Sequence, residues 1–204
     1  MSMKRPLVFA LFLGMLLTAS LQGQEMVKEP STGKSFPAAV SIASNGVTYP
    51  LSLTGVTVRK KMIFKVYGMA HYIQDPVRGK KDAVLNAMTV DGKAKMIVMD
   101  FARDVDAGKI RDTYMEGLKD NASVQEWTSI QPAADQFVGF FTQDVKEGEQ
   151  FVLRWLPGGI VSVTIAGIDK PAITNQQFAR VLWSIWFGQN SIVDREDLVD
   201  RIVD

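Results

Sequence analysis

The residues best suited to proton transfer in this sequence lie on one face of a strand that we expect over residues 63–73. Successive side chains of a strand point to opposite faces, so Tyr67, Met69 and His71 share a face. His71 is the single histidine, the side chain whose ordinary pKa lies nearest neutrality. A Ser-His-Asp hydrolase would need it, but the chain has no Gly-x-Ser-x-Gly segment. Two roles stay open for His71: an acid–base group, or a hydrogen-bonded or partly exposed structural residue.

The composition excludes several other kinds of site. Among 204 residues there is no cysteine, which rules out a disulfide, a thiol nucleophile and a cysteine-ligated metal centre. One histidine cannot make a multi-histidine metal site, and we expect neither a metal nor a cofactor. The formal net charge of +1, with no dense basic block, gives no electrostatic footprint for nucleic acid.

The first residues have the three-part layout of a secretory signal peptide. Lys4 and Arg5 precede an apolar run from Leu7 to Leu17, which small residues follow. The run is too short to span a bilayer, for which about 20 apolar residues are needed. We expect a signal peptide over residues 1–23, no membrane span in the mature protein, and a periplasmic or secreted location; the alternative is an uncleaved buried or amphipathic helix.

After this segment the chain is expected to form one antiparallel α+β domain. Residues 24–35 are mostly Lys, Glu, Pro, Ser, Thr and Gly and predict a flexible lead-in, so that the domain spans 36–204. Periodicity and turn residues predict strands over 38–42, 47–53, 63–73, 95–101, 151–156 and 160–165. Helices are expected over 81–88, from Asp106 to near Asn121, from Pro132 through Phe141, from a Thr174–Gln177 capping box to Gly188, and from Asp194. Strands and helices are grouped rather than alternating, which favours an antiparallel sheet.

Two features of the predicted elements indicate close packing. Gly68 and Ala70 leave the second face of the 63–73 strand almost bare, which suits an element packed closely against it. The predicted helix ending at Gly188 has aromatic residues on more than one side, and the helix before it carries a stripe of Phe residues. We expect these aromatic side chains to form core; the alternative is that some line a ligand cavity or form a partner surface.

Three separated segments resemble the chalcone isomerase-like family. The first is LTGVTVRKK (53–61), which runs into FKVYGMAHYI (64–73), like the family's glycine turn, arginine and Phe-Lys-Val-Tyr strand. The second joins FARDV (101–105) to a helix carrying YMEGL (114–118), and the third is WSIWFG (183–188). The resemblance covers most of the chain from residue 36 onward. It implies an open-faced β-sandwich, in which helices are layered on one face of the sheet and a ligand cleft lies between.

The resemblance also implies which residues would act. In chalcone isomerases an arginine assists at the substrate's anionic oxygen, and it maps onto Arg59; a strand threonine falls at Tyr67. The family's helix tyrosine and asparagine fall near residues 110–111 and 117–118, where neither side chain is present, although a shifted alignment would bring in Tyr114. The chain thus looks like the non-catalytic, fatty-acid-binding branch of the family.

These considerations lead to one main expectation and three alternatives. An exported protein would bind a fatty acid or similar amphipathic carboxylate in an apolar cleft, through Arg59, Tyr67 and Met69. In the first alternative, an isomerase or intramolecular lyase, Arg59 would stabilise an oxyanion and Tyr67 or His71 would move a proton. The second is an interaction module without a small ligand. In the third, Arg59, Lys60 and Lys61 form only a solvated turn and Tyr67 packs in the sheet.

Overall fold

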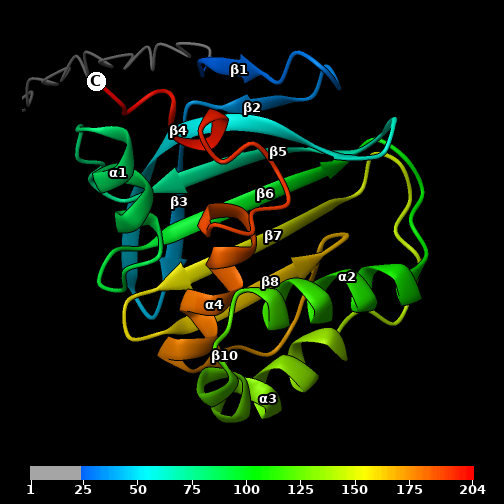
Figure 1. Ribbon diagram of the computed structural model, residues 1–204. Coiled ribbons are helices and arrows are strands. Elements are labelled where there is room, and N and C mark those ends of the chain that lie inside the picture. The colour runs from blue at the N-terminus through cyan, green and yellow to red at the C-terminus, as the bar shows by residue number, and fades with distance from the viewer. Residues whose placement is uncertain (1–23) are drawn as a thin grey trace, which may run out of the picture.

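The computed structural model describes residues 24–204, and within them the chain forms an α+β fold with helices over one face of an antiparallel sheet (Figure 1). The main strands are β3 (Ala39–Ser44), β4 (Val47–Lys61), β5 (Phe64–Ile73), β6 (Lys95–Phe101), β7 (Gln150–Leu156), β8 (Ile160–Ile165), β9 (Ile168–Asp169) and β10 (Ile173–Thr174). Their order is β10-β8-β7-β6-β5-β4-β3, with β9 beside β8. The helices are α1 (Lys81–Met88), α2 (Ala107–Asp120), α3 (Val124–Val138), α4 (Gln176–Phe187) and the 3-10 turn η1 (Asp197–Val199). The predicted fold class is confirmed.

Strand β4 is longer than the sequence predicts. Instead of ending at Leu53, it continues through an irregularity between Leu53 and Gly55 and pairs with β5 as far as Lys61. A β-bulge of this kind takes up one extra residue and lets pairing resume beyond it. Arg59 therefore lies in a strand and not in a turn, directly opposite Tyr67.

Two helices begin at other residues than predicted because other side chains cap them, and a third is shorter than predicted. Helix α3 begins at Val124, where Ser123 and Glu126 form a capping box, so Pro132 lies inside the helix rather than at its start. Asn175, not Thr174, caps α4 by accepting a hydrogen bond from the Phe178 amide. The last predicted helix is reduced to the single turn η1.

The predicted flexible lead-in is wrong for residues 24–35, because they pair with the chain that follows. Strand β1 (Met26–Lys28) pairs with β2 (Ser35–Pro37) in a small separate sheet. The turn between them packs on the bare face of β5, as predicted: a Cβ at Gly68 would lie 2.7 Å from Thr32 Oγ1. The folded unit thus begins before residue 36. The predicted signal peptide, 1–23, lies outside the described residues.

The side chains of the sheet divide between two hydrophobic clusters. On the helix-facing side, Tyr67 and Met69 join the strand, helix and C-terminal residues of the larger cluster. On the other side, Ala70 and Tyr72 pack with Phe36 and with residues of β3 and β4. Every aromatic residue of α4 is buried, so this helix is part of the core. None of the helices within residues 24–204 is long and apolar enough to cross a membrane.

Candidate functional site

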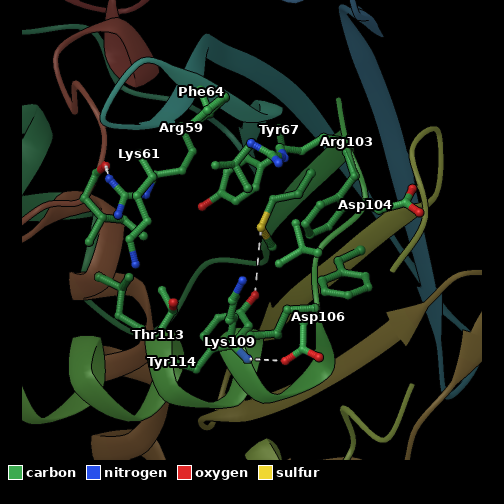
Figure 2. A pocket seen from close by; sticks show the side chains of 18 of the residues that line it. Arg59, Lys61, Phe64, Tyr67, Arg103, Asp104, Asp106, Lys109, Thr113 and Tyr114 are labelled. Carbon is green, nitrogen blue, oxygen red and sulfur yellow. Dashed lines mark hydrogen bonds between the residues drawn. The ribbon is translucent and has the colours of Figure 1, made fainter. Parts of the chain in front are cut away.

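One end of the helix-facing side of the sheet encloses a pocket of about 350 Å³. Figure 2 shows its strand residues, including Arg59, Lys61 and Tyr67, across an open space from Lys109, Thr113 and Tyr114 of helix α2. Its apolar walls are formed by Val66, Met99, Phe101, Ile110, Phe151, Ile185 and Trp186. The volume falls within the range of about 300–1,000 Å³ that small-molecule sites occupy.

Arg59 and Tyr67 lie together in this pocket, as the sequence predicts. They are directly opposite each other in the β4–β5 ladder, so their side chains share a face. Arg59 Nη1 donates hydrogen bonds to the backbone oxygens of Ile192, at 2.6 Å, and Lys60, at 2.9 Å. These bonds use one of the two terminal nitrogens, and a guanidinium has five N–H donors in all. Arg59 is thus held in place with donors left to bind a ligand.

Tyr67 provides a neutral donor beside this cation. Its hydroxyl accepts a hydrogen bond from the Trp186 indole N–H at 3.1 Å. Among the described residues the Tyr67 hydroxyl proton has no acceptor within hydrogen-bond distance, which leaves it for a ligand. Burial raises the pKa of Tyr67 to about 12, although the nearby Arg59 acts in the opposite direction. Tyr67 therefore keeps its proton at neutral pH.

The mouth of the pocket carries three more cations, one of them expected only in a solvated turn and two that the sequence did not indicate. Lys61, Arg103 and Lys109 join Arg59 in the lining. Two acids also line it, but both already have partners. Asp104 pairs with Lys146 at 3.1 Å and accepts from the backbone of Glu147; Asp106 caps α2 by accepting from the Lys109 amide. The cations that line the mouth thus outnumber the acids, and its net charge is positive.

The position of the missed cations follows from strand register. Phe101 pairs with Tyr67, so Arg103, two residues further on, emerges at the same end of the sheet as Arg59. Asp106 then starts α2, whose first turn places Lys109 across the mouth. Both residues lie in or beside the segment that carried the family resemblance, but their approach to Arg59 needs the β5–β6 pairing.

The inner part of the pocket is aromatic. Tyr114 lines it, with its hydroxyl 3.8 Å from the Met99 sulfur and its ring stacked on Phe141. Burial, with Tyr67 nearby, raises the pKa of Tyr114 well above its ordinary value. Tyr114, which the sequence analysis raised only through a shifted alignment, thus belongs to the pocket as a neutral phenol.

Met69 and His71 do not line this pocket. Met69 is fully buried in the core. His71 is four residues beyond Tyr67 on β5, about 13 Å along an extended strand, and its ring packs on Phe187. Its Nδ1 lies 2.7 Å from Thr54 Oγ1. Met69 and His71 lie on the same strand face as Tyr67, as predicted, but helix α4 covers this face at His71.

The burial of His71 determines its charge. It is fully buried, and burial, with the Lys95 ammonium as a second cause, holds its pKa well below the ordinary value. Thr54 Oγ1 donates to the Leu198 carbonyl at 2.6 Å, so it accepts from His71 Nδ1–H. His71 is thus a neutral structural residue. Among residues 24–204 there is also no group of three His, Asp or Glu side chains placed to hold a metal ion.

Comparisons with known proteins agree with this architecture. The chalcone isomerase-like family model matches residues 31–198. No curated protein matches the sequence. Among solved structures, the fatty-acid binding protein AtFAP1 of Arabidopsis thaliana is similar in fold, with a TM-score of 0.69 and 21% sequence identity. The similarity covers 87% of this chain and 97% of that one. The family model spans most of the folded unit, and the chain therefore belongs to the chalcone isomerase-like family.

Proposed function

We propose that the pocket binds a fatty acid or a similar amphipathic carboxylate and that the protein is not a catalyst. The observation that carries this proposal is the Arg59–Tyr67 pair at the mouth of an apolar cavity. A guanidinium and a phenol together match the acceptors of a carboxylate, and charge-assisted hydrogen bonds are the stronger kind. The aromatic and aliphatic interior then accepts the hydrocarbon tail.

The isomerase alternative has weaker support from the same geometry. A proton-abstracting group should have a pKa near the working pH and lie within hydrogen-bond reach of the substrate. Tyr67 lies in the pocket, but its pKa of about 12 keeps it protonated. His71 has the right chemistry but is sealed in the core, away from the pocket. Neither side chain supplies a base beside Arg59 at neutral pH.

The function is tested first by what the protein carries when it is purified. Mass spectrometry of an organic extract should detect a fatty acid or related amphiphile in the wild type. In Arg59→Ala the amount should fall by about tenfold or more, since a hydrogen bond to a charged group contributes about 1.5–3 kcal/mol. Arg78→Ala, at an exposed arginine outside the pocket, is the matched control and should leave the extract unchanged. An empty wild-type extract, together with no thermal shift on adding dodecanoate, would refute the proposal.

Export is a separate proposal that rests on the sequence of residues 1–23 alone. Its basic start, apolar run and small residues favour cleavage of this segment and delivery of the rest to the periplasm or the medium. The mass of the mature protein from a fractionated native host provides the test. A full-length protein in the cytoplasmic fraction would contradict it.

A further inference from the structure

The turn between β4 and β5 exposes three consecutive large apolar side chains. Met62 is 89% exposed, Ile63 85% and Phe64 51%. The other large exposed apolar residues of the described chain, such as Val77 and Val124, stand singly in the sequence. Single exposed apolar residues are common on protein surfaces, but a continuous group marks an interaction site. We call residues 60–65 the hairpin tip.

The backbone conformation of the hairpin tip is a second indication of an interaction site. Lys61 pairs with Phe64, so the loop has two residues, Met62 and Ile63. Met62 has a φ of 57°, in the left-handed region that favours glycine or asparagine. A two-residue hairpin loop with positive φ at its first position usually has glycine there. A large apolar side chain is thus held at a strained and fully exposed position where a smaller residue would fit better, and such strain points to function.

The charges around the tip are of one sign. Lys60, Lys61 and Lys65 flank the apolar residues, and the Arg103 guanidinium lies over the Phe64 ring at 4.6 Å from its centroid. The sequence has no acid between Glu29 and Asp75. Asp104, on the neighbouring loop, is paired with Lys146. The hairpin tip therefore combines exposed apolar side chains with cations that complement an anionic surface.

The tip is also part of the pocket mouth. Lys61, Met62, Phe64 and Arg103 all line the pocket, while Lys60 and Ile63 do not. In Figure 1 the β4–β5 hairpin ends at one edge of the molecule, beside the loop that leads from β6 to α2. A surface that contacts this tip would therefore face the entrance through which a ligand must pass.

We propose that the hairpin tip docks on an anionic lipid bilayer and thereby opens the pocket mouth toward the membrane. The inference rests on the proposed function, because an amphipathic carboxylate partitions into bilayers and would enter the pocket from there. Met62, Ile63 and Phe64 insert at the boundary between head groups and acyl chains, and Lys60 and Lys61 contact lipid phosphates, whereas the Lys65 ammonium donates to the Ser31 carbonyl. The bilayer fits better than a protein surface because the apolar group is small, and lysines lie on both sides of it in the sequence.

The test is binding of the full protein to vesicles of phosphatidylcholine mixed with phosphatidylglycerol, compared with pure phosphatidylcholine. Ile63→Ser and Lys60→Gln change the tip without changing the pocket lining. We expect affinity for the mixed vesicles to fall about tenfold in Ile63→Ser. In Lys60→Gln it should fall about fivefold, because each cation near an anionic membrane contributes about that factor. Val124→Ser, at a residue 87% exposed on α3, and Lys80→Gln, before α1, are the matched controls.

Two outcomes separate this inference from the proposed function. The variants should bind dodecanoate in solution as the wild type does, since the pocket is intact. The docking inference is overturned if the wild type binds dodecanoate but binds mixed vesicles no better than neutral ones. It is also overturned if Ile63→Ser binds mixed vesicles like the wild type. In either case a protein becomes the better occupant of the tip. If vesicles bind but dodecanoate does not, the proposed function fails and the docking surface stands.

Discussion

Each end of the β4–β5 strand pair carries two polar side chains, but one pair faces a pocket and the other is buried. At one end Arg59 and Tyr67 face a pocket, and each keeps hydrogen-bonding capacity for a ligand. At the other end Thr54 and His71 also face each other, but they are fully buried and bonded to the chain itself. The difference is made by a covering segment: η1 and the C-terminal residues lie over β4 at the His71 end (Figure 1).

The closed end shows how tightly this covering segment is fixed. Thr54 Oγ1 bridges His71 and the Leu198 carbonyl, and the Thr54 carbonyl accepts from the Arg201 amide at 3.0 Å. Gly55 allows the close approach, because it has no side chain between β4 and η1. A polar pair on a strand therefore does not reveal whether it binds a ligand. That depends on whether another part of the chain occupies the space in front of it.

The largest expected effect is on stability at the closed end. In Gly55→Ala the new Cβ would lie 2.0 Å from the Asp197 backbone oxygen, so η1 must move. We expect the free energy of unfolding, measured with urea, to fall by about 3 kcal/mol. Gly79→Ala is the control, because its Cβ would be 3.9 Å from the nearest atom, Val84 Cγ2, and the change should stay within about 0.5 kcal/mol. Equal losses in both variants would mean that the close approach at Gly55 is not what fixes the C-terminal segment.

The next effect is on the stability of the protein at acidic pH. The folded-state pKa of His71 is below its unfolded value, so the unfolded chain binds more protons as pH falls from about 6.5, and stability is lost in that direction. The stability of the wild type relative to His71→Leu should fall by about 1 kcal/mol for each pH unit below 6.5, until the folded-state pKa is reached. Urea unfolding of both proteins at several pH values measures this difference. A difference independent of pH would show that His71 also titrates normally in the folded protein.

A smaller effect is expected inside the pocket. Tyr67→Phe removes the hydroxyl that we propose as a donor to the ligand, which is also the acceptor of the Trp186 N–H. We expect dodecanoate to bind about fivefold more weakly by calorimetric titration, corresponding to about 1 kcal/mol for a neutral hydrogen bond. Tyr114→Phe, which loses only an O–H contact to sulfur at 3.8 Å, is the control and should bind dodecanoate like the wild type. If the two variants lose the same affinity, Tyr67 has no special role at the mouth.

Much of the fold could be predicted because it depends on local patterns. The Asn45–Gly46 turn has positive φ at both residues, as a two-residue hairpin requires, and the alternation along β5 gives the correct faces. Arg59 and Tyr67 came together for a similar reason, since a short hairpin connects their strands. The β4 extension could not be predicted from periodicity, because the bulge at Thr54 interrupts the alternation.

The features that sequence reasoning missed depend on distant contacts. His71 is enclosed through its partner Thr54, which donates a hydrogen bond to the Leu198 carbonyl, 144 positions further along the chain. The cations Arg103 and Lys109 reach the mouth only through the pairing of β5 with β6 and the packing of α2. Local propensity carries no information on either arrangement. The β1–β2 hairpin was missed because its polar composition resembles a linker, although Glu29 folds the turn by accepting the Ser31 amide at 2.8 Å.

The most direct test of the contrast between the two ends is the preference of the protein for dodecanoate over dodecanol. The two probes share a tail and differ in head-group charge, so their affinity ratio isolates the contribution of the cationic mouth. We expect the wild type to prefer dodecanoate by about tenfold or more, and this preference to be lost in Arg59→Gln and kept in His71→Leu. A preference that survives in Arg59→Gln, or that disappears in His71→Leu, would contradict the assignment of ligand binding to the Arg59 end.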